Sequence, residues 1–381
     1  MNAVGPEFGF GLYIHWPYCA RICPYCDFNV YAAKDRESDP LVQAIVDDIR
    51  AHRSTLPEHP PLDSVFFGGG TPSLLSPAQM ERILTAAQAS FGLKTDAEIS
   101  LEANPNDVLS GAPSDWALAG INRLSLGIQS LDDQALAFLG RDHNGKDARA
   151  AVERTQKHFD NHSVDLIYAR PGQTAEAWQQ ELTDTLALGA PHLSLYELTI
   201  EERTAFGKRA ARGDLVPMED DDQADLYDLT QEVCEAHGLP AYEVSNHART
   251  DAFQSRHNHI YWASGDWIGV GPGAHGRLTI NGHRMATEAK KRPADYLEVQ
   301  KPDQNKLSQH DTATEFLAMA LRPTSGVDLE RFETLFGVPV DTDVLSNLSE
   351  QKLARQEGQK LHLTQSGRLM ADYIASLLVP Y

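Results

Sequence analysis

The stretch LYIHWPYCARICPYCDF, residues 12–28, contains three of the four cysteines of the chain. Cys19, Cys23 and Cys26 follow an apolar and aromatic run, residues 10–15, that predicts a buried strand. Cys234 stands alone in a helical pattern, where a small buried side chain is expected. In a reducing compartment, clustered cysteines of this kind are more often a metal or redox site than a disulfide framework.

Five more runs of the same kind occur in the first half of the chain, and each predicts a buried strand. They cover residues 64–67, 98–102, 123–127, 164–168 and 193–198. Helical spacing lies between the strands, at residues 41–56, 77–91, 132–139, 147–159 and 175–188, with Asp39, Ser76 and Thr174 as expected caps. Because parallel strands need helical crossovers, this alternation predicts a parallel sheet, either open and doubly wound or a full or partial barrel.

The polar residues that follow the strands favour the barrel. The cysteine loop follows the first run, GGGTP (68–72) follows the second, and Glu102 with Asn104 ends the third. Gln129, Asp165 and Glu197 take similar places in the next three runs. Polar groups at the C-terminal ends of successive parallel strands are typical of a barrel active site. We therefore predict an α/β fold with a partial, six-stranded TIM-like barrel.

The second half of the chain has a different pattern. An acidic run at 219–222 predicts the solvated start of a helix that reaches about Ala236. A section rich in Gly, His, Tyr and Trp follows, and the C-terminal part predicts a small helical unit. This unit has a strand at 360–363, a cap at Thr364 and a helix to Leu378, an order that resembles part of a winged helix. The expected units are a barrel (1–240), the Gly/His/aromatic segment (241–300) and a mostly helical C-terminal domain (301–381).

The composition limits the class of partner. With 41% hydrophobic and 23% charged residues among 381, the chain is ordinary globular protein rather than disordered, collagen-like or disulfide-rich. Its formal net charge of -21 makes nucleic acid and anionic membranes poor partners. No apolar run is long enough to span a bilayer, and the start MNAVGPEFGF lacks the features of a secretion signal. We expect a cytoplasmic protein that is not an integral membrane protein.

The cysteine spacing C-x3-C-x2-C, with Tyr25 before the last cysteine, resembles that of the radical S-adenosylmethionine (SAM) enzymes. Three thiolates from one short loop can hold a cubane cluster and leave the fourth iron open to a small chelate. Zinc with a distant fourth ligand, such as His15 or Cys234, is an alternative, because structural zinc takes four protein ligands. Thiols without any metal are another. The glycine turn at 68–70 offers close backbone approach and N–H and C=O groups for an amino acid head group.

Several segments together resemble the oxygen-independent coproporphyrinogen III oxidase family, in order along nearly the whole chain. They are residues 12–28, GGGTPS (68–73), LEANP (101–105), LGIQS (126–130) and DLIY (165–168). The resemblance implies that the three cysteines hold a 4Fe-4S cluster whose free iron binds SAM. By position, it implies a SAM site lined by Tyr13, Tyr25, Gly69, Gly70, Thr71, Glu102, Gln129, Arg141 and Asp165. The chemistry is compatible, since carboxylates can hold ammonium or hydroxyl groups and Arg141 can pair with a carboxylate.

Two features favour the related haem chaperones of the HemW group over the oxidases. Oxidases of the family carry a further cysteine where this chain has Phe28, and a phenyl ring cannot replace a thiol in redox or metal chemistry. The string HNHIYW (257–262) matches H-N-x-x-Y-W, which is associated with haem binding in that group. Imidazole is an established haem ligand, and Tyr and Trp offer flat apolar faces. The resemblance therefore implies that His257 is an axial haem ligand; a hydrogen-bonded loop histidine is the alternative.

The expected function is that of a haem chaperone with a radical SAM fold, which binds a 4Fe-4S cluster, SAM and haem and passes haem to an acceptor protein. A membrane-associated acceptor is among the candidates. The alternative is the oxidase itself, in which a SAM-derived radical would start the decarboxylation of porphyrinogen propionates. A zinc-structured barrel of unrelated function is a third hypothesis, and whether the chain is an enzyme stays open.

Four cations receive weaker assignments. Arg256, Arg284 and Lys290 are candidates to meet haem propionates, because they lie near the HNHIYW string in the sequence. Ala169-Arg170 stands where family members more often carry Gly-Leu. The added Arg170 is expected either to alter the cavity floor or to pair with a carboxylate.

Overall fold

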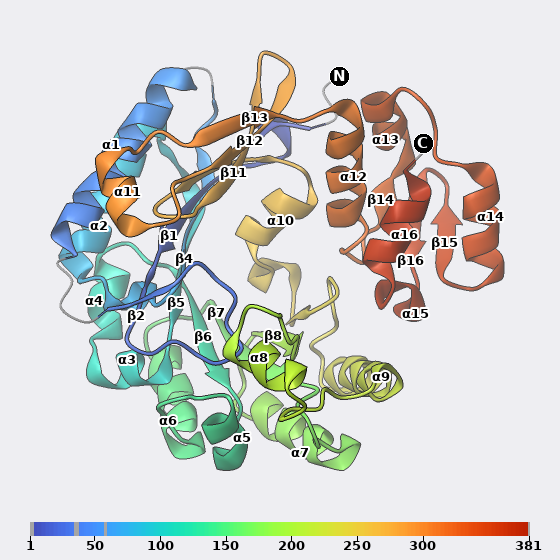
Figure 1. Ribbon diagram of the computed structural model, residues 1–381, viewed down its shortest axis with the longest axis horizontal. Helices are drawn as coiled ribbons and strands as arrows, with labels where there is room; N and C mark the ends of the chain where they lie inside the picture. The colour runs from blue at the N-terminus through green and yellow to red at the C-terminus, as the bar shows by residue number, and fades with distance from the viewer. Residues whose placement is uncertain (1–3, 34–37, 57–58, 380–381) are drawn as a thin grey trace.

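The six predicted strands are confirmed as neighbours in one parallel array. The computed structural model describes residues 4–33, 38–56 and 59–379, so the first three residues of the amino-terminal stretch lie outside it. The array contains, in spatial order, β1 (Phe10–Trp16), β4 (Leu62–Gly69), β5 (Leu93–Ala103), β6 (Arg123–Gln129), β7 (His162–Tyr168) and β8 (His192–Glu197). These strands form an arc with helices on its outside (Figure 1).

Further strands extend both edges of the arc. β10 (Asp266–Val270) pairs parallel with β1, and β11 (His275–Ile280), β12 (His283–Glu288) and β13 (Asp303–Lys306) follow antiparallel. β9 (Asn246–Ala248) pairs antiparallel with β8. The resulting 11-stranded sheet ends at β13 and β9 and is a partial barrel, which confirms the predicted fold class. Strand β10 was not predicted from the sequence. Its surroundings contain many turn glycines, and no other apolar run of strand length lies beside it.

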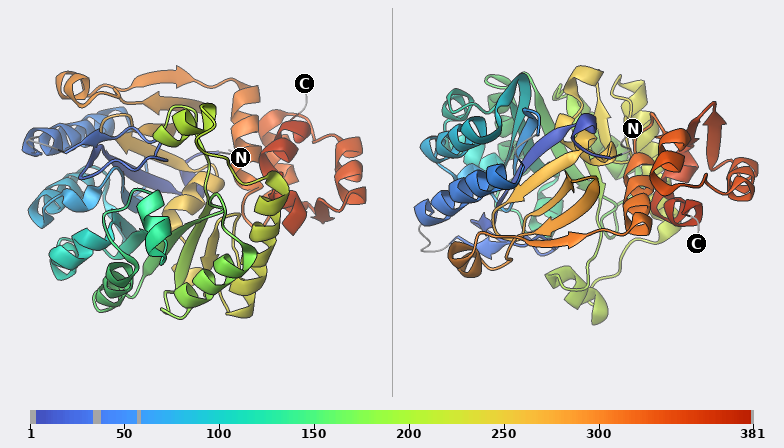
Figure 2. Two further views of the ribbon diagram at one scale, coloured as in Figure 1. Left: turned by 60° about the horizontal axis from the view of Figure 1, so that its bottom comes forward. Right: turned by 90° about the horizontal axis from the view of Figure 1, so that it is seen from above.

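The five helices predicted between the strands are confirmed, and they cover the outer face of the sheet (Figure 2). They are α1 (Asp39–Thr55), α2 (Pro77–Phe91), α5 (Asp133–Phe138), α6 (Gly145–Gln156) and α7 (Ala175–Leu186). Ser76 and Thr174 cap α2 and α7 as predicted. Asp39 is not a cap: it is the first residue of α1, and Ser38 holds the cap position. Pro40 is the second residue of the helix, where its missing N–H costs no helical hydrogen bond, so the first turn can begin one residue earlier, at Asp39.

The remaining elements are short, apart from the helix at the acidic run. That helix is α9 (Asp220–Ala236), which buries Cys234 as predicted. Burial raises the pKa of the Cys234 thiol to about 12. The others are β2 (Tyr18–Cys19), β3 (Tyr31–Ala32), α3 (Pro105–Ser110), α4 (Pro113–Leu118), α8 (Ala205–Ala211), α11 (Pro293–Glu298) and the 3-10 helices η1 (Pro6–Phe8), η2 (Pro72–Leu74) and η3 (Asp251–Phe253). None of the described helices is long and apolar enough to cross a membrane.

Alternate residues of each strand face opposite sides of the sheet, and the two sides differ in chemistry. In β6, Leu124, Leu126 and Ile128 are buried in the core that the outer helices cover. Arg123, Ser125, Gly127 and Gln129 instead line the inside of the barrel. β7 and β8 repeat the arrangement with inward polar residues. The barrel is therefore apolar on its outside and polar on its inside.

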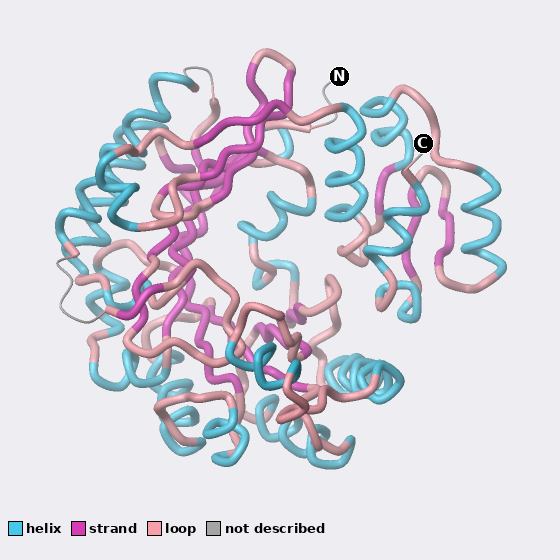
Figure 3. The backbone as a smooth tube through the Cα atoms, in the orientation of Figure 1, coloured by secondary structure: helices cyan, strands magenta, loops and turns pink. Residues whose placement is uncertain are grey.

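A helix inside the arc closes one end of the barrel. α10 (Arg256–Trp262) contains the HNHIYW string and lies in the middle of the ring of strands (Figure 3). Ser255 caps it by accepting a hydrogen bond from the N–H of Asn258. The backbone N–H groups of Arg256 and His257 donate to the Glu98 carboxylate of β5. The sequence had predicted only a loop-rich segment here.

The C-terminal part has its own core beside the barrel (Figure 1). It contains α12 (Gln309–Ala320), β14 (Val327–Asp328), α13 (Leu329–Phe336), α14 (Thr342–Glu350), β15 (Ala354–Glu357), β16 (Lys360–Leu363), α15 (Gln365–Arg368) and α16 (Ala371–Leu378). The three strands form one antiparallel sheet in the order β14-β16-β15. The strand at 360–363 and the Thr364 cap match the sequence prediction. The single helix predicted after the cap is instead divided into α15 and α16 by a turn at residues 369–370, and α16 ends at Leu378 as predicted.

Arg331 joins this C-terminal part to the barrel. Its guanidinium lies over the Phe8 ring, 3.4 Å from the centroid, and over the Phe316 ring at 4.9 Å. It also donates to the carbonyl oxygen of Ala263, at the C-terminal end of α10. The Arg331 guanidinium therefore contacts two aromatic rings and a backbone carbonyl, and these contacts connect three separate segments of the chain.

Replacing Arg331 by methionine should therefore destabilise the protein by about 2–3 kcal/mol, from lost cation–π contacts and a carbonyl left without its donor. The measurement is urea unfolding followed by tryptophan fluorescence. Lys301→Met, at an exposed site, is the matched control and should change the midpoint little. An Arg331 variant with the same midpoint as its parent would contradict this account.

Candidate functional site

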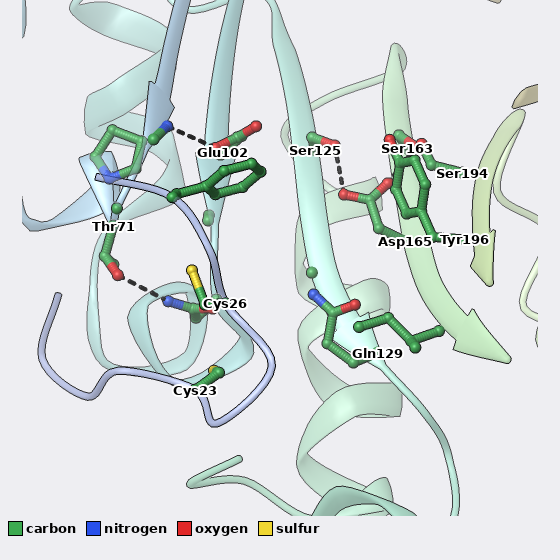
Figure 4. Close-up of a pocket in the computed structure, with 18 of the residues that line it drawn as sticks. Cys23, Cys26, Thr71, Glu102, Ser125, Gln129, Ser163, Asp165, Ser194 and Tyr196 are labelled. Atoms are coloured by element: carbon green, nitrogen blue, oxygen red, sulfur yellow. Dashed lines mark hydrogen bonds between the residues drawn. The ribbon is translucent and has the colours of Figure 1, made fainter. Parts of the chain in front are cut away.

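A cavity of about 660 Å³ runs along the inside of the barrel. The cysteine loop forms the wall of the cavity at the C-terminal ends of the strands, and α10 forms its wall at the other end. The residues that the sequence analysis assigned to the cluster, to SAM and to axial haem ligation all line this cavity. These are Cys19, Cys23, Cys26, Tyr13, Tyr25, Gly69, Gly70, Thr71, Glu102, Gln129, Arg141, Asp165 and His257. Figure 4 shows several of these side chains directed into the cavity.

The three loop cysteines are free thiols on one wall of the cavity. The paired strands β2 and β3 hold the two ends of the loop, and the N–H of Cys26 donates to the carbonyl of Cys23 at 3.2 Å. Burial raises the pKa of Cys19, and raises that of Cys26 to about 11. Without a metal the Cys19 and Cys26 thiols are protonated at neutral pH, so a metal must displace their protons.

The donor set fits a cluster better than one zinc ion. Among the described residues, no group of three or more His, Cys, Asp or Glu side chains is arranged around one ion. His15 is engaged through both ring nitrogens, with the Tyr13 hydroxyl and the Asn29 carbonyl, each at 3.0 Å. Cys234 is buried outside the cavity lining. Neither proposed fourth zinc ligand is therefore available, whereas three thiols from one loop suit a cluster held through three of its irons.

The glycine turn packs against the cysteine loop. The N–H of Gly70 donates to the Trp16 carbonyl at 2.7 Å, and that of Thr71 to the Tyr18 carbonyl at 2.9 Å. A Cβ on Gly69, which has φ +105°, would lie 2.6 Å from the His15 ring. The sequence argument that these N–H groups are free for a ligand was wrong, because the backbone of the cysteine loop already accepts from them. The glycines are needed for that close approach.

Two carboxylates face the middle of the cavity. Asp165 accepts hydrogen bonds from the Ser125 and Ser163 hydroxyls, at 2.7 and 2.8 Å. Glu102 accepts from the Gly69 N–H at 3.2 Å. Burial, followed by repulsion from Asp165, raises the pKa of Glu102 to about 7. No cation among the described residues pairs with either carboxylate, so both can hold an ammonium or hydroxyl group of a ligand.

Arg141 stands between the cysteines and the strand ends. It donates to Cys23 Sγ at 3.3 Å, to the Gly127 carbonyl at 3.0 Å and to the Asn104 side chain. Its Nε is buried and lacks a hydrogen-bond partner among the described residues. Gln129, at the end of β6, has φ +66°, a strained conformation for this residue type. An unsatisfied donor and local strain are features of a site that is completed by a ligand.

His257 lies at the opposite end of the cavity and is almost completely buried. Its ring nitrogens pair with the Ser64 hydroxyl at 2.7 Å and the Tyr261 hydroxyl at 2.6 Å. Burial lowers its pKa to about 3, so the imidazole is neutral. A neutral imidazole can bind a metal, but here only by giving up one of these two hydrogen bonds.

The inward polar residues of the strands were missed by the sequence analysis. They line the cavity between the carboxylates and α10: Ser100, Arg123, Ser125, Ser163, His192, Ser194 and Tyr196. Figure 4 shows Ser125, Ser163, Ser194 and Tyr196 around Asp165. The signal was present as polar residues at every second position, as in RLSLGIQ of β6. Serine is small, so these positions leave the barrel hollow.

The structure also decides the weaker cation assignments. Arg170 pairs with the buried Glu181 carboxylate at 2.6 Å and does not line the cavity, so it meets a carboxylate, as one alternative held. Arg256, Arg284 and Lys290 pair with Asp96, Asp266 and Asp303. None of these three cations lines the cavity, and nearness in sequence was therefore a poor guide to their position.

Comparisons with known proteins agree with this geometry. Residues 13–184 match the Radical SAM superfamily, and residues 307–370 match the HemN C-terminal domain. The chain is 32% identical over 371 residues to the heme chaperone HemW of Bacillus subtilis, covering 95% of this chain and 97% of that protein. It is 35% identical to radical S-adenosyl methionine domain-containing protein 1, mitochondrial, of Danio rerio, covering 93% and 82%.

The fold is similar to that of coproporphyrinogen III oxidase (HemN) from Escherichia coli, a radical SAM enzyme. The TM-score is 0.81 at 21% identity, and the match covers 98% of this chain and 90% of that one. At 21% identity the structural likeness establishes only the architecture. The distinction between the oxidases and the HemW group depends on the relatives that are similar in sequence.

Glu102 should make the stability of the metal-free protein depend on pH. Its pKa is about 7 in the folded state against 4.5 as the ordinary value. Within that window the folded state holds a proton that the unfolded state has released, so stability falls as pH rises. Glu102→Gln should remove this loss of stability, because the amide does not ionise. Partial solvent access to Glu102 makes the loss smaller than full burial would. Between about pH 5 and pH 8 the parent should lose about 1–2 kcal/mol more than the variant.

The measurement is urea unfolding of both proteins across this pH range. Asp48, whose pKa burial raises to about 7, titrates in the same window but is common to both proteins. Glu350→Gln, at an exposed site, is the control and should follow the parent. Parallel curves for parent and Glu102→Gln would show that Glu102 does not carry the shift.

Proposed function

The chain belongs to the HemW family of radical SAM proteins, and from this membership we propose that it is a haem chaperone that binds haem and passes it to an acceptor protein. The observation that carries the proposal is the cavity itself. It has three cysteine thiols on one wall and the histidine of the H-N-x-x-Y-W string at the far end. The relatives named heme chaperone match over most of their own length. A protein acceptor and a cytoplasmic location are parts of the same proposal.

The cysteines are proposed to hold a 4Fe-4S cluster, which would offer SAM an open iron. Glu102 and Asp165 would then hold polar groups of SAM, and Arg141 Nε would gain an acceptor. Tyr13, Tyr25, Gly69, Gly70, Thr71 and Gln129 would complete the SAM site. The division at residues 240 and 300 is proposed on the same grounds, since residues 241–300 supply α10 to the barrel from outside its βα repeats.

The oxidase is the second candidate, favoured only by the likeness in fold to HemN. Against it stands Phe28, which fills the place of the oxidases' additional cysteine and is exposed at the cavity mouth. An aromatic hydrocarbon supplies neither a proton nor a metal ligand there. The chaperone hypothesis needs no chemistry from this position.

Replacing Cys23 by serine should abolish the cluster, since a hydroxyl is a poor iron ligand beside two thiols. The measurement is iron and sulfide content after anaerobic reconstitution, with the visible absorbance of the product. Cys234→Ser is the matched control, because Cys234 is buried outside the cavity, and it should retain both. Equal iron and sulfide in the Cys23→Ser and parent proteins would remove the basis of the cluster assignment.

Haem binding tests the function directly. The parent, reconstituted under anaerobic conditions, should give a Soret shift on titration with haemin and release haem to an apo-acceptor such as apomyoglobin. His257→Ala should weaken haem binding about tenfold or more and change the spectrum, since an axial ligand is lost. Tyr261→Phe, which frees one ring nitrogen, should bind haem at least as tightly as the parent.

The alternatives give different results in the same preparation. A parent that binds no haem rejects the chaperone hypothesis. A parent that forms vinyl groups from coproporphyrinogen with SAM and a reductant is the oxidase instead. If His257→Ala keeps the spectrum and affinity of the parent, the axial ligand lies elsewhere.

A further inference from the structure

Two large apolar side chains of the cysteine loop are exposed at the mouth of the cavity. Ile22 is 45% exposed and Phe28 is 63% exposed, and both belong to the cavity lining. Exposed apolar groups at the rim of a ligand cavity are typical of a binding surface, because covering them removes apolar area from water. The same groups spread singly over the surface would need no explanation.

An unpaired cation lies beside them. Arg21 is exposed, lines the cavity and makes no hydrogen bond or ion pair within the described chain. The other two arginines of the lining differ: Arg123 donates to Asn161 and to the Phe253 carbonyl, and Arg141 is bonded near Cys23. In a chain of net charge -21, a cation left free at the cavity mouth suits an anionic ligand.

We infer that Arg21, Ile22 and Phe28, called the mouth ledge below, form a docking site for haem, with the apolar pair against the macrocycle and Arg21 beside a propionate. A flat apolar body with carboxylates at one edge matches this combination. Asp27 and Glu201 also line the cavity and would repel a haem propionate. A propionate therefore meets the least repulsion beside Arg21. The inference rests on the proposed function and adds the place where haem first meets the protein.

The layout of the cavity separates this ledge from His257. His257 bonds to Ser64, near the start of β4, whereas Gly70 beyond the end of that strand contacts the cysteine loop. The six residue steps from Ser64 to Gly70 span about 20 Å at 3.3 Å per residue, which is longer than a porphyrin is wide. Glu102 and Asp165, proposed to hold SAM, lie between the two ends. A haem bound to His257 therefore does not cover the mouth ledge. When SAM is bound in the middle of the cavity, the mouth ledge is the part of the cavity that haem can still reach.

The test is haemin titration of the cluster-reconstituted protein under anaerobic conditions with SAM present. Ile22→Ser/Phe28→Ser should raise the Kd for haem about tenfold, since two apolar contacts are lost. Arg21→Glu should raise it about three- to tenfold, more at low salt than at high salt. With the dimethyl ester of haemin, whose propionates carry no charge, Arg21→Glu and parent should bind equally.

Matched controls are Leu118→Ser, at an 86% exposed apolar site on α4, and Lys301→Glu, at an exposed site outside the cavity lining. Both should keep the affinity of the parent. Iron and sulfide content must equal that of the parent in every protein compared. If the double variant loses its cluster, Arg21→Glu is compared with the parent using the two haemin forms, and this comparison decides alone. Arg21 makes no hydrogen bond or ion pair with the described residues, so its replacement removes no such contact within the protein.

The outcomes separate this inference from the proposed function. A parent that binds no haem overturns the function. A parent that binds haem, with ledge variants of unchanged affinity, overturns the ledge alone. Ledge variants that bind haem normally but fail to pass it to an acceptor would also overturn it, because the surface would then contact the acceptor protein.

Discussion

The structure depends on the alternation of side chains along its parallel strands. Apolar residues at one set of positions pack under the helices, while serines, carboxylates and glycines at the other set face inward. Barrels of this size are usually filled by branched apolar side chains. Here small polar groups replace them, and the interior is a cavity rather than a core. All ligand chemistry inferred for the protein takes place in this cavity.

Close backbone contacts then fix the cysteine loop over the cavity. Gly70 and Thr71 donate to the carbonyls that lead into the loop, and a Cβ on Gly271 would lie 2.2 Å from the His15 carbonyl. Asn29, at the other end of the loop, donates to the carbonyls of Pro272 and Lys291. The loop is therefore held from both β4 and the β10–β11 turn.

The two ends of the cavity have different electrostatic character. At the cysteine end, Arg141 and Arg21 bring positive charge to the thiols and the mouth. At the α10 end, His257 is neutral and enclosed by hydroxyl and aromatic groups, with the Phe66 ring stacked 5.1 Å away. Arg331 links the end of α10 to the C-terminal part.

The sequence by itself determined the strand and helix order, the partial barrel, the cysteine set and the motif residues that line the cavity. Those features rest on local periodicity and on motifs whose spacing is short, such as C-x3-C-x2-C. Only the tertiary structure decided where α10 lies, that the glycine N–H groups are already bonded, and that Arg284 is buried against Asp266. These depend on contacts between residues far apart in the chain, which pattern and propensity do not encode. For the same reason the ring of inward serines gained its meaning only once the strands were placed side by side.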